Sequence, residues 1–264
     1  MYSMKMTLYL TVLSVLLLSV AGCSGSDAPS PKDDVSGVTL QTRGGGETAG
    51  YRLLVFEGSA GKCLVNQSFG SGNESVRLAN GTYGFVTLSS VEGFDLPVAG
   101  TTAGIDPSVS VALKAGGKCS PVQVSALQEI GIPGTSVYEV ALKPATCLLK
   151  LELKDAPEGV ALGLTNMYGG VSLTGSYAGD APLCSSYPLD GEGNICLPTK
   201  GNAVLQYTGV ASNLPETSGT LDLGMPLDPG YTYSFTLQWR GEHLKITSTV
   251  EKWKDGDETT GDAE

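Results

Sequence analysis

The strongest constraint on this chain is the alternation of apolar and polar residues near its C-terminus. From Tyr231 to Trp239, aromatic and aliphatic side chains alternate with threonine, serine and glutamine. A period of two places the apolar side chains on one face of an extended strand. After a turn at 240–243, residues 244–250 alternate in the same way, which predicts the returning strand of a hairpin. Similar segments recur earlier in the chain, at 51–56, 81–89, 138–143 and 147–154.

The residues between these segments are typical of an all-β protein. Glycine alone accounts for 36 of the 264 residues, and Gly, Pro, Asn or Asp separates one alternating segment from the next. These residue types favour tight turns. No convincing helical periodicity occurs outside the first 22 residues, and only 122–130 is ambiguous. Short strands at even spacing predict β-sandwiches.

Pro144 marks the expected boundary between two sandwiches. Proline cannot donate a hydrogen bond to a central β-ladder, and a new alternating segment begins directly after it. We expect an N-terminal sandwich at 37–143 and a C-terminal sandwich at 144–254, each of ordinary domain size. Residues 255–264 include five acidic side chains and are expected to form a solvated tail.

Residues 1–22 have the layout of a secretory signal peptide. Lys5 precedes an apolar run that is too short to span a membrane, and the run ends in Val-Ala-Gly before Cys23. This ending resembles the lipobox of bacterial lipoproteins, which implies cleavage before Cys23 and attachment of lipid to it. The alternative is an ordinary signal peptide with a chance cysteine. Residues 23–36 are rich in Ser, Asp, Pro and Gly, and we expect them to form a flexible tether.

Charge and residue types argue against several classes of function. The chain has 27 acidic and 16 basic residues and a net charge of −11, which is unfavourable for binding nucleic acid. The single histidine, His243, falls at the expected hairpin turn, and no nucleophile motif accompanies it. We therefore expect no catalytic residues and no cofactor. Oxygen ligands at 190–194 could suit Ca²⁺, but the completing acidic ligand is missing, so we expect a turn and no metal.

Five cysteines follow the lipobox cysteine, so at least one cannot pair within the chain. Cys184 and Cys196 flank a loop rich in Pro and Gly, and we predict a disulfide between them. A Cys63–Cys119 bridge is a weaker possibility, and Cys147 is in phase with the apolar residues of its strand, which predicts a buried thiol. The spacing alone leaves the pairing of these last three cysteines open.

Four features, in this order, resemble the fimbrillin-like proteins of Bacteroidales, which are the subunits of type V fimbriae. Each feature is weak alone, and the order in which they occur carries the resemblance across the mature chain. They are the lipobox with its polar tether; Thr42-Arg43 and a Gly-rich gap before Tyr51–Glu57; the segment Leu78–Phe85 with its Gly-Thr-Tyr; and the hairpin that begins at Gly230, followed by Trp253.

The resemblance implies two transthyretin-like β-sandwich domains and export as an outer-membrane lipoprotein. It also implies removal of an N-terminal segment by an Arg-specific protease and polymerisation with other fimbrial subunits by strand exchange. Cleavage after Arg43 would free a first strand at 37–42, and the region beyond Val250 is the candidate donor strand. The alternative is that Arg43 is only an exposed linker residue. A structural or tip subunit is favoured because the chain lacks the Cys-rich opening of dedicated anchor proteins.

The function expected from these features is that of a non-enzymatic fimbrial subunit that supports adhesion to a host or bacterial surface ligand. The alternative is a surface glycan-binding lipoprotein of a polysaccharide-uptake system. Such proteins share the lipobox, the tether and the sandwiches, but they need exposed aromatic platforms, and this chain has only 2 Trp. An exposed aromatic group would favour the glycan-binding protein, whereas buried aromatic residues and a removable first strand would favour the fimbrial subunit.

We predict that Cys23 is lipidated. The substitution Cys23→Ala is expected to abolish incorporation of labelled palmitate and to move the protein out of the membrane fraction, because lipid is the anchor that this sequence predicts. Unchanged labelling of the Cys23→Ala protein would contradict the prediction.

Overall fold

The computed structural model describes residues 35–42, 50–70, 74–89, 92–180, 187–190, 193–209, 217–241, 243–247 and 251–254. All regular elements in these ranges are β-strands, so the all-β prediction is confirmed. The described residues contain no helix of the length and apolar character needed to cross a membrane. The ambiguous stretch 122–130 contributes to two strands, β8 (Gln123–Ser125) and β9 (Gln128–Ile132).

The first strand of the chain is the central strand of a three-stranded sheet. β1 (Val35–Thr42) lies parallel to β10 (Val137–Val140) on one side and antiparallel to β4 (Glu74–Ala79) on the other. Val38 and Leu40 are completely buried, whereas Val35 is 43% exposed. This alternation follows from the period of two, and it turns one face of β1 toward the core.

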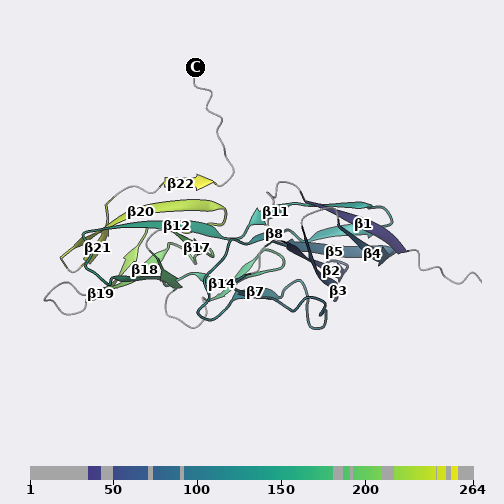
Figure 1. The fold of residues 1–264 in the computed structure, drawn as a ribbon, viewed down its shortest axis with the longest axis horizontal. Helices are drawn as coiled ribbons and strands as arrows, with labels where there is room; N and C mark the ends of the chain where they lie inside the picture. The colour runs from purple at the N-terminus through teal and green to yellow at the C-terminus, as the bar shows by residue number, and fades with distance from the viewer. Residues whose placement is uncertain are drawn as a thin grey trace, which may run out of the picture. The chain divides into compact units, whose positions relative to one another are not determined.

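A six-stranded sheet packs beneath β1, and Figure 1 shows β1 lying over β5 and β2 of this sheet. Proline ends β11 at one edge of the sheet, where a missing N–H is tolerated. The other edge is formed by β3. In order across the sheet, the strands are β11 (Leu142–Pro144), β8, β5 (Gly81–Leu88), β2 (Tyr51–Glu57) and β3 (Cys63–Phe69), and β9 also pairs with β5.

Strand β2 is buried on both faces, which differs from the half-exposed strand that alternation predicts. Leu53 and Val55 pack into a core cluster with Val38 and Leu40 of β1. Leu54 and Phe56, on the opposite face, belong to a second and larger cluster. All four of these β2 side chains are completely buried. The run Leu-Leu-Val-Phe therefore serves two cores at once, as in strands that are covered on both sides.

The predicted aromatic strand and its hairpin are confirmed. In β20 (Tyr231–Arg240), Tyr233, Phe235 and Trp239 are buried, and β21 (His243–Ile246) returns antiparallel to the end of the strand. Figure 1 shows β20 beside β12 (Cys147–Lys154), to which it runs parallel. The same sheet includes β17 (Asn194–Cys196) at the edge beyond β12, and β22 (Glu251–Lys254) paired with the start of β20.

Two four-stranded sheets complete the described fold. One of them joins residues from both sides of Pro144, because β7 pairs with β14. The larger core cluster also contains residues from both sides, so the division into 37–143 and 144–254 stays a prediction. In order, the sheets are β15 (Tyr177–Asp180), β14 (Tyr168–Ser172), β7 (Ser110–Leu113) and β6 (Phe94–Asp95); and β16 (Tyr187–Leu189), β13 (Ala161–Leu164), β18 (Val204–Gly209) and β19 (Thr217–Asp222).

The substitution Leu40→Ala should destabilise the protein by about 2–5 kcal/mol, because it removes a completely buried side chain of the central strand and leaves a cavity. Chemical denaturation followed by tryptophan fluorescence measures the change. The matched control is Val35→Ala on the same strand, whose side chain is largely exposed and whose loss should change stability by less than about 0.5 kcal/mol. Equal effects of the two substitutions would contradict this account of β1.

Candidate functional site

The candidate assembly site is the position of β1 between β4 and β10. The backbone of β1 pairs on both edges, with Thr39–Thr42 opposite Val137–Val140 and Val35–Leu40 opposite Ala79–Glu74. One further hydrogen bond runs from the N–H of Thr39 to the carbonyl of Ser136, at 2.9 Å. Among the described strands, β10 and β4 pair in this sheet with β1 alone, so the described ladder of this sheet depends on β1.

The floor of the β1 site is apolar and aromatic. The rings of Phe85 and Tyr138 lie 5.0 Å apart beneath the sheet, and both side chains are almost completely buried. The Tyr138 hydroxyl lies 3.4 Å from the Ser125 Oγ. Burial raises the pKa of Tyr138, so its phenol stays neutral. A strand that occupies this site must therefore present apolar side chains at alternate positions, as Val38 and Leu40 do.

The predicted processing residue follows the last residue of β1. Arg43 lies outside the described residues, which end at Thr42 and resume at Gly50, directly before β2. The structure therefore places β1 as a strand that ends where the predicted cleavage would occur. Cleavage at Arg43 itself stays a prediction.

The candidate donor region is paired within this chain. Residues of β22 lie antiparallel to the first half of β20, with Thr232 opposite Trp253. The second half of β20 pairs with β21. Lipid attachment to Cys23 cannot be placed, because residues 1–34 also lie outside the described residues.

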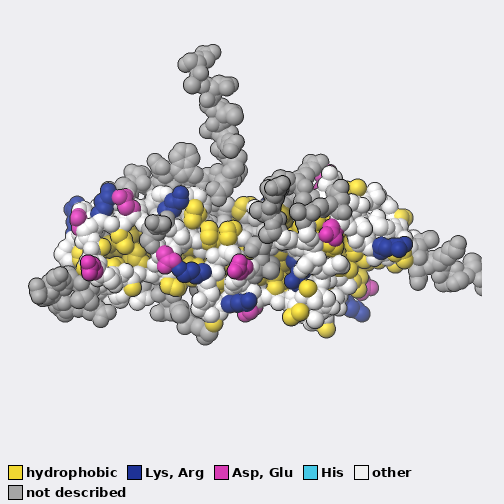
Figure 2. All heavy atoms as spheres, viewed as in Figure 1, with side chains coloured by type: hydrophobic (Ala, Val, Ile, Leu, Met, Phe, Trp, Pro, Cys, Tyr) yellow, Lys and Arg dark blue, Asp and Glu magenta, His cyan; other side chains and the backbone are white. Residues whose placement is uncertain are grey.

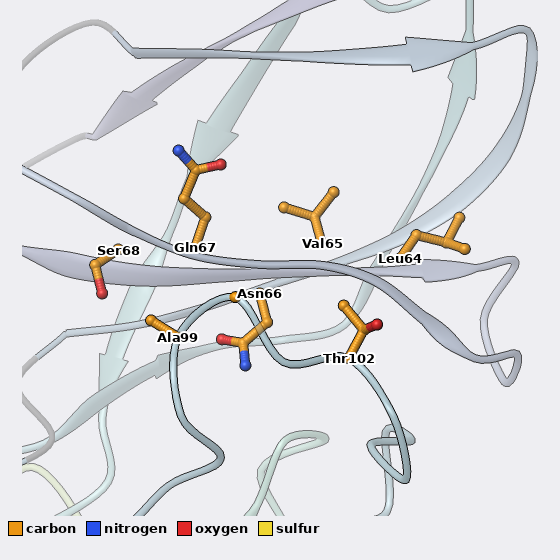
Figure 3. A pocket seen from close by; sticks show the side chains of 8 residues that line it. Leu64, Val65, Asn66, Gln67, Ser68, Ala99 and Thr102 are labelled. Carbon is orange, nitrogen blue, oxygen red and sulfur yellow. The ribbon is translucent and has the colours of Figure 1, made fainter.

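A shallow hollow of about 580 Å³ lies at the edge strand β3, beside the loop at 97–104 (Figure 3). Asn66 points from β3 toward this loop, whereas Val65 and Gln67 point to the other side of the strand. None of the described residues that line the hollow is aromatic, so they do not provide the stacking surface that sugars use. The residues that line it are Leu64, Val65, Asn66, Gln67, Ser68, Ala99, Gly100 and Thr102.

The Asn66 side chain fastens the loop to the edge of the sheet. Its Nδ2 donates to the carbonyls of Val98 and Thr101, at 3.0 and 2.7 Å, and its Oδ1 accepts from Nη1 of Arg52 at 2.9 Å. The same guanidinium donates to the carbonyl of Pro97. The backbone N–H of Gly100 also bonds to the carbonyl of Asn66. The loop therefore covers part of a strand edge that would otherwise attract another strand.

Three buried thiols gather where the larger core meets β12 and β17. Cys147 on β12 lies directly opposite Cys196 on β17, and Cys119 is close enough to affect the ionisation of both. Burial raises the pKa of Cys119 to about 11 and that of Cys147 to about 12, so both are protonated at neutral pH. The predicted burial of Cys147 is confirmed. Cys184 lies outside the described residues, so its pairing with Cys196 stays a prediction.

The other polar features of the sequence have structural roles. His243 is exposed at the start of β21, opposite Arg240. Asn194 holds a local turn, since its side-chain amide bonds to both the N–H and the carbonyl of Asp190. The Asp190 carboxylate in turn pairs with Lys118. Among the described residues, no group of three or more His, Cys, Asp and Glu side chains is arranged to hold a metal ion.

The surface charges on the face shown in Figure 2 are interspersed, with acidic and basic side chains scattered rather than gathered. A nucleic-acid site would need a continuous basic surface. The aromatic residues Tyr233, Phe235 and Trp239 are in the core, and Trp239 packs edge-on against Tyr207. These residues cannot form an exposed binding platform.

The fold matches solved structures of surface proteins at low sequence identity. A candidate polysaccharide-binding protein from Bacteroides thetaiotaomicron has a TM-score of 0.58 at 12% identity, covering 83% of this chain and 99% of that one. A candidate adhesin from Bacteroides ovatus has a TM-score of 0.56 at 12% identity, covering 84% and 96%. The fimbrial anchor protein Mfa2 from Porphyromonas gingivalis has a TM-score of 0.54 at 12% identity, covering 84% and 98%.

These likenesses define the class of fold, which is that of the β-sandwich adhesins and fimbrial proteins of Bacteroidales. The all-β sandwich fold expected from the resemblance to fimbrillin-like proteins is therefore confirmed, whereas the expected count of two domains stays a prediction. No protein-family model matches the sequence. A search of curated proteins finds no match either.

The Arg52–Asn66 contacts are the part of this region that sequence reasoning missed. The only available signal was an asparagine within an extended segment, where asparagine is uncommon. Its partners are loop carbonyls more than 30 positions away, and no local pattern predicts such contacts.

We predict that Asn66→Ala destabilises the protein by about 1–3 kcal/mol. The substitution leaves two loop carbonyls and the Arg52 guanidinium without their amide partner in a half-buried region. Proteolysis within 97–104 should also become faster, which limited digestion and mass spectrometry would detect. Gln67→Ala, on the exposed side of β3, is the control and should change neither quantity. An unchanged loop in Asn66→Ala would refute the role given to this side chain.

Proposed function

We propose that this chain is a non-enzymatic subunit of a Bacteroidales-type surface fimbria, in a structural or tip position, and that it supports adhesion. The observation that carries the proposal is the placement of β1. It is the first strand of the described chain, it is central in its sheet, and its last residue immediately precedes Arg43. Few arrangements allow one cut to release one central strand.

Loss of β1 would create a site that favours a replacement strand. Two strands, β4 and β10, would each lose their ladder partner, and unpaired edges attract extended chains. The apolar floor around Phe85 and Tyr138 would lose the cover of Val38 and Leu40. Full burial of one apolar side chain of the replacement strand on this floor would contribute about 1.5–3 kcal/mol. A strand from a second subunit would restore both the ladder and the cover.

Strand exchange of this kind propagates into a filament, because donor and acceptor surfaces differ and the contact does not close on itself. The region beyond Val250 is the candidate donor. Among the described strands, β22 forms a ladder with β20 alone, so withdrawing β22 breaks a short pairing at the edge of one sheet. Trp253 is its one large apolar residue, so this region meets the apolar requirement of the site at one position only, and its terminal residues are too polar to fill the groove.

The proposed location is the outer surface of the outer membrane, with lipid on Cys23 as the anchor before processing. β1 includes the last two residues of the expected tether at 23–36, so residues 23–34 would separate β1 from the membrane. The partners of the protein would be other fimbrial subunits, together with a host or bacterial surface ligand that adhesion requires.

A glycan-binding lipoprotein is the second candidate, because one of the similar structures is described as a polysaccharide-binding protein. Two observations argue against it: the aromatic residues Tyr233, Phe235 and Trp239 of β20 are buried, and none of the described residues around the hollow at β3 is aromatic. Binding of bacterial polysaccharides by the protein before cleavage would favour this candidate over the fimbrial subunit.

We predict that an Arg-specific protease cuts the purified mature protein after Arg43 and that the cut protein forms ladders of oligomers. The ladder is expected because release of β1 opens the acceptor site. N-terminal sequencing identifies the cut, and native electrophoresis with electron microscopy reports assembly. Arg43→Ala should stay monomeric and should abolish surface fibres.

The matched control for this experiment is Arg77→Ala, an exposed arginine on β4 opposite Gly37 of β1. The Arg77→Ala protein should be cut after Arg43 and should assemble like the wild-type protein. Cleavage at another position, or native fibres that persist in the Arg43→Ala strain while the cut protein stays monomeric, would rule out the mechanism.

A further inference from the structure

The thiols of Cys147 and Cys196 are placed for a bond that the sequence did not suggest. The two residues are directly opposed in the antiparallel ladder between β12 and β17. Opposed residues share one face of a sheet, and their Cα atoms lie about 4.5 or 5.5 Å apart, depending on the type of pair. Disulfides form when Cα atoms are about 4.4–6.8 Å apart. Both possible spacings therefore satisfy this requirement.

Side-chain positions agree with this geometry. The Cys147 Sγ lies 3.4 Å from the carbonyl oxygen of Cys196, so it already reaches the partner residue across the ladder. Both side chains are buried, with 3% and 0% exposed. The two thiols are free in the structure.

We propose that Cys147 and Cys196 form a cross-strand disulfide when the chain folds after export. The inference rests on the export proposed above, because disulfides persist in oxidising compartments and are rare where thiols are kept reduced. It replaces the Cys184–Cys196 pairing predicted from spacing, since Cys196 can form only one bond.

The bond forms by exchange with an oxidised dithiol protein of the cell envelope. One thiolate attacks the disulfide of that oxidant and forms a mixed disulfide, and the second thiolate then displaces the oxidant's sulfur. Two protons and two electrons leave the cysteine pair, and the oxidant is released as a dithiol. Because the folded thiols are buried and protonated, this exchange precedes the docking of β17 on β12.

The proposed bond would secure a weakly held strand. β17 has only three residues, and among the described strands it lies at the edge of its sheet and pairs with β12 alone. Tyr187 adds one contact nearby, since its hydroxyl donates to the carbonyl of Ile195 and accepts from the N–H of Cys119. A covalent link between β12 and β17 closes a long loop, which is the case in which a disulfide restricts the unfolded chain most.

Cys119 is the competing partner within the described residues. It is buried near both other thiols, but it lies outside any strand and is not in ladder register with either of them. Cys63 is buried in the same large cluster, and its Sγ donates to the carbonyl of Val65 on its own strand. We therefore expect Cys63 and Cys119 to remain thiols.

Peptide mapping of the full exported protein tests the proposal directly. Free thiols are blocked by alkylation at low pH, and the protein is then cut without reduction by a protease specific for glutamate. Cleavage after glutamate separates all five cysteines, because a glutamate lies between each cysteine and the next. The expected product is 140–152 linked to 193–216. A link between 193–216 and the peptide of Cys184 or Cys119, or free thiols at both positions, would overturn the proposal for the native protein.

A second arm separates failure of this inference from failure of the proposed export. The full chain is reduced and unfolded in denaturant, refolded in a glutathione redox buffer, and mapped in the same way. A Cys147–Cys196 bond after refolding, together with free thiols in the native protein, would support the geometry and contradict oxidative export. Any other pairing after refolding would contradict the geometry and leave the fimbrial proposal intact.

Thermal unfolding gives an independent readout. Reduction should lower the melting temperature of the oxidised wild-type protein by roughly 10 °C. The double substitution Cys147→Ala and Cys196→Ala should abolish this response to reductant. Cys63→Ala, the matched control at another buried thiol, should keep it. A response that survives the double substitution would refute the proposal, and the wild-type peptide map decides the matter if that variant does not fold.

Discussion

The double-sided burial of β2 is the interaction on which the rest of the structure depends. Leu53 and Val55 on one face and Leu54 and Phe56 on the other are completely buried. The six-stranded sheet that contains β2 therefore separates two cores. The smaller core lies beneath β1, and the larger core includes residues from both sides of Pro144. Burying both faces of a strand contributes about twice the apolar area of a half-exposed strand. The six-stranded sheet therefore keeps one fully packed face even where the layer over its other face is thin.

This division makes β1 separable. The buried apolar residues of β1, Val38 and Leu40, belong to the smaller core, and neither contributes to the larger one. Withdrawing β1 would uncover one face of the six-stranded sheet. The opposite face, with Leu54 and Phe56, would keep its packing. A protein that must lose a strand and persist until a replacement arrives needs this separation. The division of the cores therefore supports the proposed function, as does the position at which β1 ends.

The sequence predicted the structure best for a strand that has one buried face and one solvent-exposed face. The alternation from Tyr231 to Trp239 predicted β20, its buried aromatic residues and its hairpin, because a period of two states which side chains face the core. It was less informative for β2, since an unbroken apolar run does not tell how many layers cover a strand. The pairing of β7 with β14, and of Cys147 with Cys196, depends on which distant strands meet. Local spacing carries no record of that choice, and the Cys184–Cys196 disulfide that spacing suggested stays a prediction.

The treatment of exposed edges explains why exchange would be confined to one place. Asn66 and Arg52 hold a loop against β3, and Pro144 removes a donor at the opposite edge of the same sheet. Both devices discourage the addition of a foreign strand. Within the part of the chain that the structure describes, the β1 site is protected by β1 itself, which fills it with paired backbone and with Val38 and Leu40. An intact chain would therefore present no ready acceptor, and a single cut beside β1 would expose one. Timing of assembly would then be set by proteolysis rather than by the concentration of subunits.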